Sequence, residues 1–85
     1  MSTYNPIGSY LAAQPGPPGT TCTITFKQFQ QLTGVPLPRS AFQHSAWWGN
    51  NPQRHVQAQA WLGAGWRVAP RGVDFVKQQV LFEKV

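Results

Sequence analysis

The residues that could carry chemistry are concentrated in one short stretch, HSAWWGNNPQRH, which runs from His44 to His55. It contains two histidines, two adjacent tryptophans, two adjacent asparagines, a glutamine and an arginine. Imidazole, amide and guanidinium groups can hydrogen-bond to bases and phosphates, and an indole ring can stack on an unpaired base. This combination indicates a binding surface, with nucleic acid as the first partner to consider.

The same inventory argues against an enzyme. The two acids of the chain, Asp74 and Glu83, are expected in a turn and in a terminal strand, so they do not form a pair for general acid–base catalysis. Cys22 lies in a predicted strand, where a thiol is usually an inert core residue. Its spacing from His44 and His55 does not match the close pairs of zinc ligands. We therefore expect no catalytic residue, metal, cofactor or small-molecule substrate.

Charge is the strongest compositional signal. Seven Lys and Arg residues face two acids, which gives a net charge of +5 on 85 residues. Such an imbalance attracts polyanions, and nucleic acid is the commonest of these. The single cysteine cannot form an internal disulfide, and neither an export signal nor a membrane span is evident. We expect one cytoplasmic domain, 1–85, which would be nucleoid-associated if it binds DNA and would have no membrane partner.

The start of the chain predicts a short helix between two irregular segments. Residues 1–4 are expected to be a tail. NPIGSYLAAQ, residues 5–14, has apolar residues at helical spacing, with Asn5 as a cap and Pro6 in the first turn. The proline and glycine residues of 15–20 end this helix in a loop.

A strand and a helix are predicted to follow the loop. The β-branched, alternating residues 21–25 favour a strand. Thr25 and Gln28 resemble a capping box for the helix FKQFQQLT. Gly34 suits the left-handed position that ends this helix, and Pro36 prevents it from resuming.

The second half predicts two helices and a terminal hairpin. One helix is expected over 38–46, and the next over 53–64 with Asn51 as its cap. The hairpin 66–85 would pair WRVAP with QQVLFEKV around a turn at RGVD, residues 71–74. We expect the short strand of the first half to join the edge of this hairpin.

The order of elements predicts an α+β fold of winged-helix type. Three to four short helices would pack on a small antiparallel sheet made of the short strand and the C-terminal hairpin. The order helix, strand, helix, helix, helix, strand, strand resembles a winged helix-turn-helix domain with one additional middle helix. This similarity is one of element order, and fold alone does not establish function.

Three segments are predicted to contact nucleic acid. The helix 38–46 stands where a helix-turn-helix places its recognition helix, and the start of helix 53–64 offers backbone N–H groups to a phosphate. The basic hairpin would contact the DNA backbone. Each segment has a structural alternative, since asparagine can cap a helix, glutamine can solvate it, and charge can protect a sheet edge. The candidate residues are Arg39, Ser40, Gln43, His44, Trp48, Asn50, Asn51, Gln53, Arg54, His55, Gln57, Arg67, Arg71 and Lys77.

The adjacent tryptophans are open to two interpretations. On a helix Trp47 and Trp48 would point about 100° apart, so one can enter the core while the other covers its edge. Both could be structural, or one could stack on a base next to the asparagines. The sequence does not decide which of the two is exposed. Trp61 and Trp66 are more simply core residues.

The run from 37 to 68, LPRSAFQHSAWWGNNPQRHVQAQAWLGAGWRV, resembles a small uncharacterised bacterial domain family. That family has the patterns L-P-x-S-A, A-W-W-x-N and H-x-Q-A-x-A-W-L-x-A-G-W. ITFKQFQQLTG and YNPIGSYL match its layout, whereas the GNNPQR junction and the proline-rich loop depart from it. Relatives occur alone or beside nuclease-like domains, which is compatible with DNA recognition. The polar positions implied by the resemblance are Ser40, His44, Asn50, His55 and Gln57.

These observations lead to a DNA-binding hypothesis with two alternatives. The chain is predicted to be a transcriptional regulator or an architectural factor that contacts duplex DNA, as a homodimer because one small module buries little surface. The first alternative is a protein-interaction module, antitoxin-like or an anti-defence inhibitor, that uses a Trp-rich surface and an exposed strand edge. The second is binding of RNA or single strands through Trp48.

Overall fold

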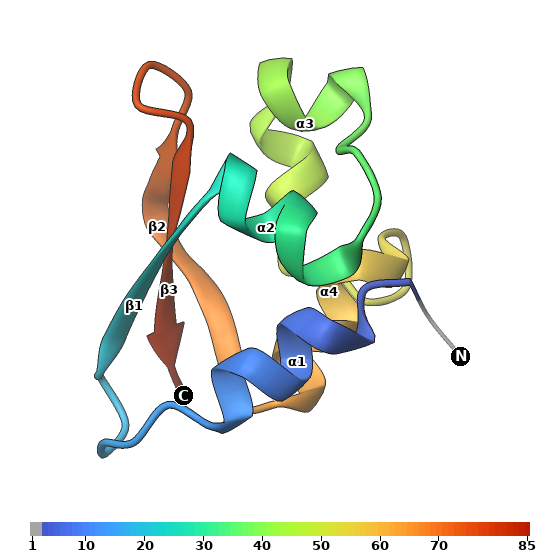
Figure 1. The fold of residues 1–85 in the computed structure, drawn as a ribbon. Coiled ribbons are helices and arrows are strands. Elements are labelled where there is room, and N and C mark those ends of the chain that lie inside the picture. The colour runs from blue at the N-terminus through green and yellow to red at the C-terminus, as the bar shows by residue number, and fades with distance from the viewer. Residues whose placement is uncertain (1–2) are drawn as a thin grey trace.

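The fold has two layers, a three-stranded antiparallel sheet and a group of short helices on one of its faces (Figure 1). A computed structural model describes residues 3–85. The predicted tail 1–4 lies partly outside these residues, and Thr3 and Tyr4 form a turn. The elements in chain order are α1 (Asn5–Ala12), β1 (Thr21–Thr25), α2 (Phe26–Thr33), α3 (Arg39–Gln43), the 3₁₀ helix η1 (Ser45–Trp48), α4 (Val56–Gly63), β2 (Trp66–Asp74) and β3 (Gln79–Lys84). The α+β class is confirmed.

β3 is the central strand of the sheet, and the strand order is β1-β3-β2. β1 pairs antiparallel with β3, as expected for a short strand that joins the terminal hairpin. Ile24 lies opposite Val80, and the two residues are 1% and 0% exposed. Because side chains alternate between the faces of a strand, Thr23 and Leu81, the next pair, lie on the face that carries no helices.

The hairpin turn is not where the sequence indicated. β2 continues through RGVD to Asp74, and residues 75–78 form the turn. The register between β2 and β3 shifts between Val68 and Val73, which is a bulge. Arg71 has a left-handed φ of 57°, and a Cβ on Gly72 would lie 2.8 Å from two carbonyl oxygens. Gly72 therefore lies at a bulge where two backbone segments approach closely. Glycine is typical of such bulges as well as of turns, which is why RGVD indicated a turn.

The predictions of β1 and α2 from local sequence signals are confirmed. β1 covers the predicted residues 21–25. The capping box is present, since Gln28 N donates to Thr25 Oγ1 at 3.0 Å and Thr25 N donates to Gln28 Oε1 at 2.9 Å. Gly34 follows α2 with a φ of 77°. For α1 the cap position is Tyr4, so the prediction of Asn5 as the cap is wrong, and the helix ends at Ala12.

Both helices predicted in the second half are shorter than expected. The helix over 38–46 is interrupted at His44, whose extended backbone separates α3 from η1. The helix over 53–64 begins only at Val56. Asn51 Oδ1 accepts hydrogen bonds from the backbone N–H of residues 53 and 54, at 3.1 and 3.3 Å. This asparagine therefore closes a turn ahead of α4, where the sequence indicated a helix cap.

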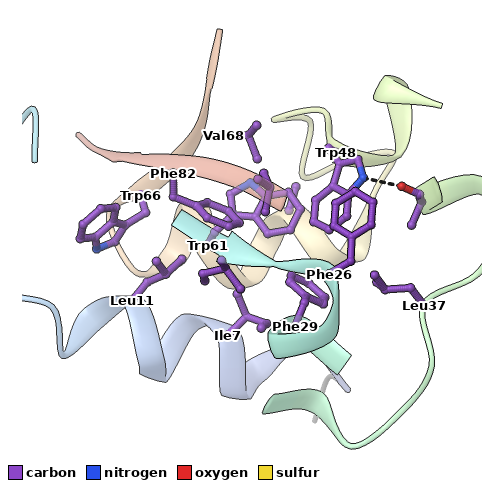
Figure 2. Packing of buried hydrophobic residues seen from close by; sticks show 14 residues of the cluster. Ile7, Leu11, Phe26, Phe29, Leu37, Trp48, Trp61, Trp66, Val68 and Phe82 are labelled. Atoms are coloured by element: carbon purple, nitrogen blue, oxygen red, sulfur yellow. Dashed lines mark hydrogen bonds between the residues drawn. The ribbon is translucent and has the colours of Figure 1, made fainter. Parts of the chain in front are cut away.

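Aromatic rings fill the space between the sheet and the helices (Figure 2). Trp48 is 1% exposed and stacks on Phe26, with ring centroids 5.1 Å apart. Trp61 and Trp66 are fully buried, which confirms that they are core residues. Trp47 is the half-buried member of the tryptophan pair. No helix of residues 3–85 has the length and apolar character that a membrane span requires.

Candidate nucleic-acid interface

Asn50 makes three hydrogen bonds within the molecule. Its Oδ1 accepts from Trp61 Nε1 at 3.0 Å and from Val68 N at 2.9 Å, and its Nδ2 donates to Val68 O at 2.9 Å. These bonds join the segment after η1 to α4 and to β2. A buried indole N–H needs an acceptor, and Asn50 supplies one to Trp61. Asn50 therefore has a structural role, while its residue remains exposed at the surface.

Trp48 and Gln57 are also structural. Trp48 Nε1 donates to Ala41 O at 2.9 Å, which is the dashed line in Figure 2. Gln57 is 5% exposed and its Nε2 donates to Trp47 O at 2.7 Å. Neither side chain has a surface on which nucleic acid could rest. This placement corrects both predictions and removes the residue on which single-strand binding depended. Trp48, Trp61 and Trp66 are buried, so among the four tryptophans Trp47 contributes most of the exposed ring surface.

The segment before α4 lies apart from the hairpin. Gln53 and Arg54 are exposed, His55 is half-buried, and Gln59 Nε2 donates to Pro52 O at 2.9 Å, which holds the segment against α4. Figure 1 shows residues 50–55 near the start of α1, on the side away from the hairpin turn. The prediction of one face that unites Arg54 with the hairpin cations is therefore wrong.

α3 and the hairpin turn lie at the same end of the molecule, at the top of Figure 1. One ring joins them: Phe26 contacts Phe42 of α3 with centroids 5.4 Å apart, and Phe75 of the turn at 6.3 Å. The backbone N–H of Phe26 also donates to Gln78 O at 2.8 Å. We call six polar residues of α3, of its C-cap and of the hairpin the cationic end; they are Arg39, Ser40, Gln43, His44, Arg71 and Lys77.

The side chains of the cationic end face solvent. All six residues are exposed, and within residues 3–85 none of their side chains takes part in a hydrogen bond or an ion pair. Arg67 differs, because its Nη2 lies 2.6 Å from Glu83 Oε1 in an ion pair across the sheet. The positive charge of Arg67 is thus matched within the protein, whereas Arg39, Arg71 and Lys77 form no ion pair within residues 3–85.

A groove extends from the cationic end between η1 and the bulge of β2. Its volume is about 280 Å³, and Arg71, Ser45 and Asn50 are among the residues that line it. The left-handed backbone of Arg71 places this arginine at the bulge rather than in the regular strand. Ser45 did not stand out in the sequence, because nothing local distinguishes a groove-lining serine from any other surface serine.

The acids leave an excess of positive charge at the cationic end. Asp74 lies beside the turn, where its Oδ1 accepts from the backbone N–H of Val76 at 3.0 Å and of Lys77 at 2.9 Å. Arg39, Arg71 and Lys77 therefore outnumber the one nearby carboxylate, and two positive charges remain. The Asp74 carboxylate shapes the turn and also reduces the local positive potential.

Cys22 is a weak candidate for covalent chemistry. It is half-buried in β1, opposite Phe82. Burial raises the pKa of its thiol above the ordinary value, because the charged thiolate loses hydration. The thiol therefore stays protonated near neutral pH, and it is the thiolate that acts as a nucleophile.

A family model described as a domain of unknown function, DUF7662, matches residues 5–84. The chain belongs to this family. The matched range begins with α1 and ends with β3, so the DUF7662 domain comprises every helix and strand of the structure. The expectation of an uncharacterised small domain family is thereby confirmed, and the description assigns it no activity. No curated protein matches the chain, and no solved structure does.

Proposed function

We propose that this DUF7662 domain binds duplex DNA with its cationic end. The observation that carries the proposal is that Arg39 of α3, Arg71 of the β2 bulge and Lys77 of the turn are exposed and have no ion-pair partner among residues 3–85. Guanidinium and ammonium groups bind phosphate oxygens, and the release of counterions from DNA drives such binding. The groove lined by Arg71 and Ser45 offers room for part of the backbone beside these cations.

The length of α3 and the internal bonds of two amides favour contacts to the phosphate backbone over contacts to base edges. α3 has five residues, so it rises only about 7.5 Å along its axis, which is short for a helix that reads several bases. Asn50 and Gln57 use their amides in internal hydrogen bonds, which leaves Gln43 as the exposed amide of α3. An architectural or nucleoid-associated role is therefore better supported than a sequence-specific regulator.

A winged-helix arrangement is part of the proposal. The terminal hairpin would act as the wing beside α3, and the strand order β1-β3-β2 with helices on one face is compatible with it. In this arrangement the hairpin adds a sequence-independent contact, since Arg71 and Lys77 meet phosphates rather than bases.

The salt dependence of binding tests the proposal. We expect a short mixed-sequence duplex to bind in fluorescence anisotropy, with three phosphate contacts giving a log–log salt slope of about −2.7. The affinity would then fall about 40-fold between about 50 and 200 mM salt. The triple variant Arg39→Ala, Arg71→Ala and Lys77→Ala should flatten this slope towards zero.

A matched control separates local contacts from overall charge. Arg54 is also an exposed arginine, and its segment lies away from the hairpin. Arg54→Ala should change the affinity by less than about twofold, whereas Arg71→Ala removes one phosphate contact and lowers the slope by about 0.9. Equal effects of Arg54→Ala and Arg71→Ala would contradict the assignment to the cationic end. The absence of any binding at low salt would overturn the proposal itself.

A further inference from the structure

The two edges of the sheet are protected very differently. The edge formed by β2 carries Pro70, a bulge, and the charged residues Arg67 and Arg71. Proline, bulges and charge are the features that keep an edge strand from pairing with another chain. The edge formed by β1, TCTIT, has no charged residue, no proline and no glycine, and its register with β3 is regular.

β1 points backbone hydrogen-bonding groups away from the sheet. Lys84 N donates to Thr20 O, and Phe26 N donates to Gln78 O, so residues with even numbers face β3. In an antiparallel ladder the intervening residues face outward, which here are Thr21, Thr23 and Thr25. Gln28 Oε1 accepts the N–H of Thr25. The outward N–H groups of Thr21 and Thr23 remain for a further strand, and in the described chain no strand lies there.

A hollow adjoins this edge on the helical side of the sheet. It has a volume of about 190 Å³ and lies between Ile24 of β1, Tyr10 of α1 and Leu32 of α2. A strand added beside β1 would point alternate side chains towards this side. Backbone bonds together with a hollow for alternate side chains are the two components of recognition by strand addition.

We propose that a second copy of this chain pairs antiparallel with β1, so that the two three-stranded sheets become one. All five residues of β1 are paired in only one register, in which Thr23 lies opposite the partner's Thr23. Thr21 then lies opposite the partner's Thr25. Cys22 lies beside the partner's Ile24, next to the hollow. This dimer does not depend on DNA binding.

The sequence of β1 favours a second copy over a different partner. A two-fold axis makes each strand contact its own sequence, and β1 presents three threonines that can pair with threonines across the ladder. Two protomers that each carry a net charge of +5 repel each other wherever cations meet. β1 has no charged residue, so pairing of two β1 strands places no cation opposite another within the strands.

Charge swapping at Thr23 tests the pairing directly. Thr23 is exposed on the strand, so Thr23→Lys and Thr23→Glu should each fold as the wild type does by circular dichroism. Sedimentation should show a wild-type dimer, whereas each variant alone is a monomer because like charges face each other across the axis. An equimolar mixture should restore a dimer that contains one copy of each. A wild-type monomer up to millimolar concentration, or a mixture that stays monomeric, would overturn the proposal.

Thr23→Pro removes the outward N–H while leaving the β1–β3 ladder intact, because Thr23 faces away from β3. The loss of two symmetric hydrogen bonds should raise the dimer dissociation constant by about tenfold to hundredfold. Thr23→Val is the matched control, since it keeps the N–H and the branched shape, and it should change the constant by less than about threefold. If Thr23→Pro dimerises as tightly as Thr23→Val, the pairing lies elsewhere.

A disulfide tests the register. In a Cys22→Ser background, Thr23→Cys places two thiols opposite each other at a Cα separation of about 5.5 Å, within the range that a disulfide spans. Oxidation should link Thr23→Cys protomers into a dimer, whereas Thr21→Cys, whose partner position is Thr25, should link poorly by itself. Equal linkage of the two variants would contradict the register.

Discussion

The polar side chains around Asn50 and those of the cationic end differ in where their hydrogen bonds go. Asn50, Gln57 and the indole N–H groups of Trp48 and Trp61 all bond to other parts of the protein. Arg39, Ser40, Gln43, His44, Arg71 and Lys77 have no such side-chain bond among residues 3–85. The first set lies within residues 48–61 and the second set flanks it on both sides in sequence, yet one holds the fold together and the other faces solvent.

This difference shows that donor-rich residues are not binding residues by composition alone. Each buried indole N–H needs a hydrogen-bond acceptor inside the protein, and nearby side-chain amides and backbone carbonyls provide it. Trp66 Nε1 is a buried side-chain donor that finds no acceptor in the described residues, so not every buried indole N–H is hydrogen-bonded. The side chains left over after the core is satisfied are the ones available for a partner.

The largest effect is expected from the core. Trp48→Ala should lower the free energy of unfolding by about 3–5 kcal/mol, because it leaves a cavity against Phe26 and the other rings. Urea denaturation followed by circular dichroism measures this loss. Trp47→Ala is the control, and its half-buried side chain should cost clearly less. Equal losses would mean that the pair does not divide into a core and an edge residue.

The adjacent asparagines should differ in the same measurement. Asn50→Ala leaves Trp61 Nε1 and the backbone of Val68 without partners and should cost about 2–3 kcal/mol. Asn51→Ala loses only local turn bonds at the surface and should cost about 0.5–1 kcal/mol. Should the order be reversed, Asn50 would not be the residue that joins β2 to α4.

Arg71 should separate stability from binding. Its left-handed φ is strained for arginine, so Arg71→Gly should raise the free energy of unfolding by up to about 1 kcal/mol while it weakens DNA binding. Arg71→Ala keeps the strain and removes the same cation, so it should weaken DNA binding equally without the gain in stability. Anisotropy and urea denaturation on both variants measure the two effects. A loss of stability in Arg71→Gly would contradict the strain.

The smallest effect is expected at Asp74. Asp74→Asn keeps the Oδ1 acceptor of the turn and removes the carboxylate charge, so the free energy of unfolding should change by less than about 0.5 kcal/mol. DNA affinity at low salt should rise by about twofold to fivefold, because less negative charge faces the phosphates. A stronger rise from Glu83→Gln, which frees Arg67 on the helix-free face of the sheet, would place the DNA on that face instead.

Local signals predicted the elements that depend on neighbouring residues. The Thr25–Gln28 capping box and Gly34 fixed α2, and alternation identified β1 and the hairpin. The same signals gave wrong predictions where one sequence pattern is compatible with two local structures. RGVD has the composition of a turn, yet the strand passes through it as a bulge, and Asn51 before Pro52 closes a turn instead of capping α4.

The candidate site was only partly visible in the sequence. The roles of Asn50, Gln57 and Trp48 depend on bonds across 7 to 18 residues, which no local pattern encodes. Which cations share one end depends on the path of α3 and the hairpin turn around Phe26, and this too is tertiary. The excess of positive charge was readable from composition, whereas its division between the hairpin and the Arg54 segment was not.

The position of Phe26 has a mechanical consequence. Its ring lies between Phe42 of α3 and Phe75 of the turn, and it is itself stacked on Trp48 in the core. The two segments that carry the cations therefore pack against one buried ring, whose position sets the spacing between them. A duplex that contacts both segments would have to match this spacing, which a bend in the DNA could supply.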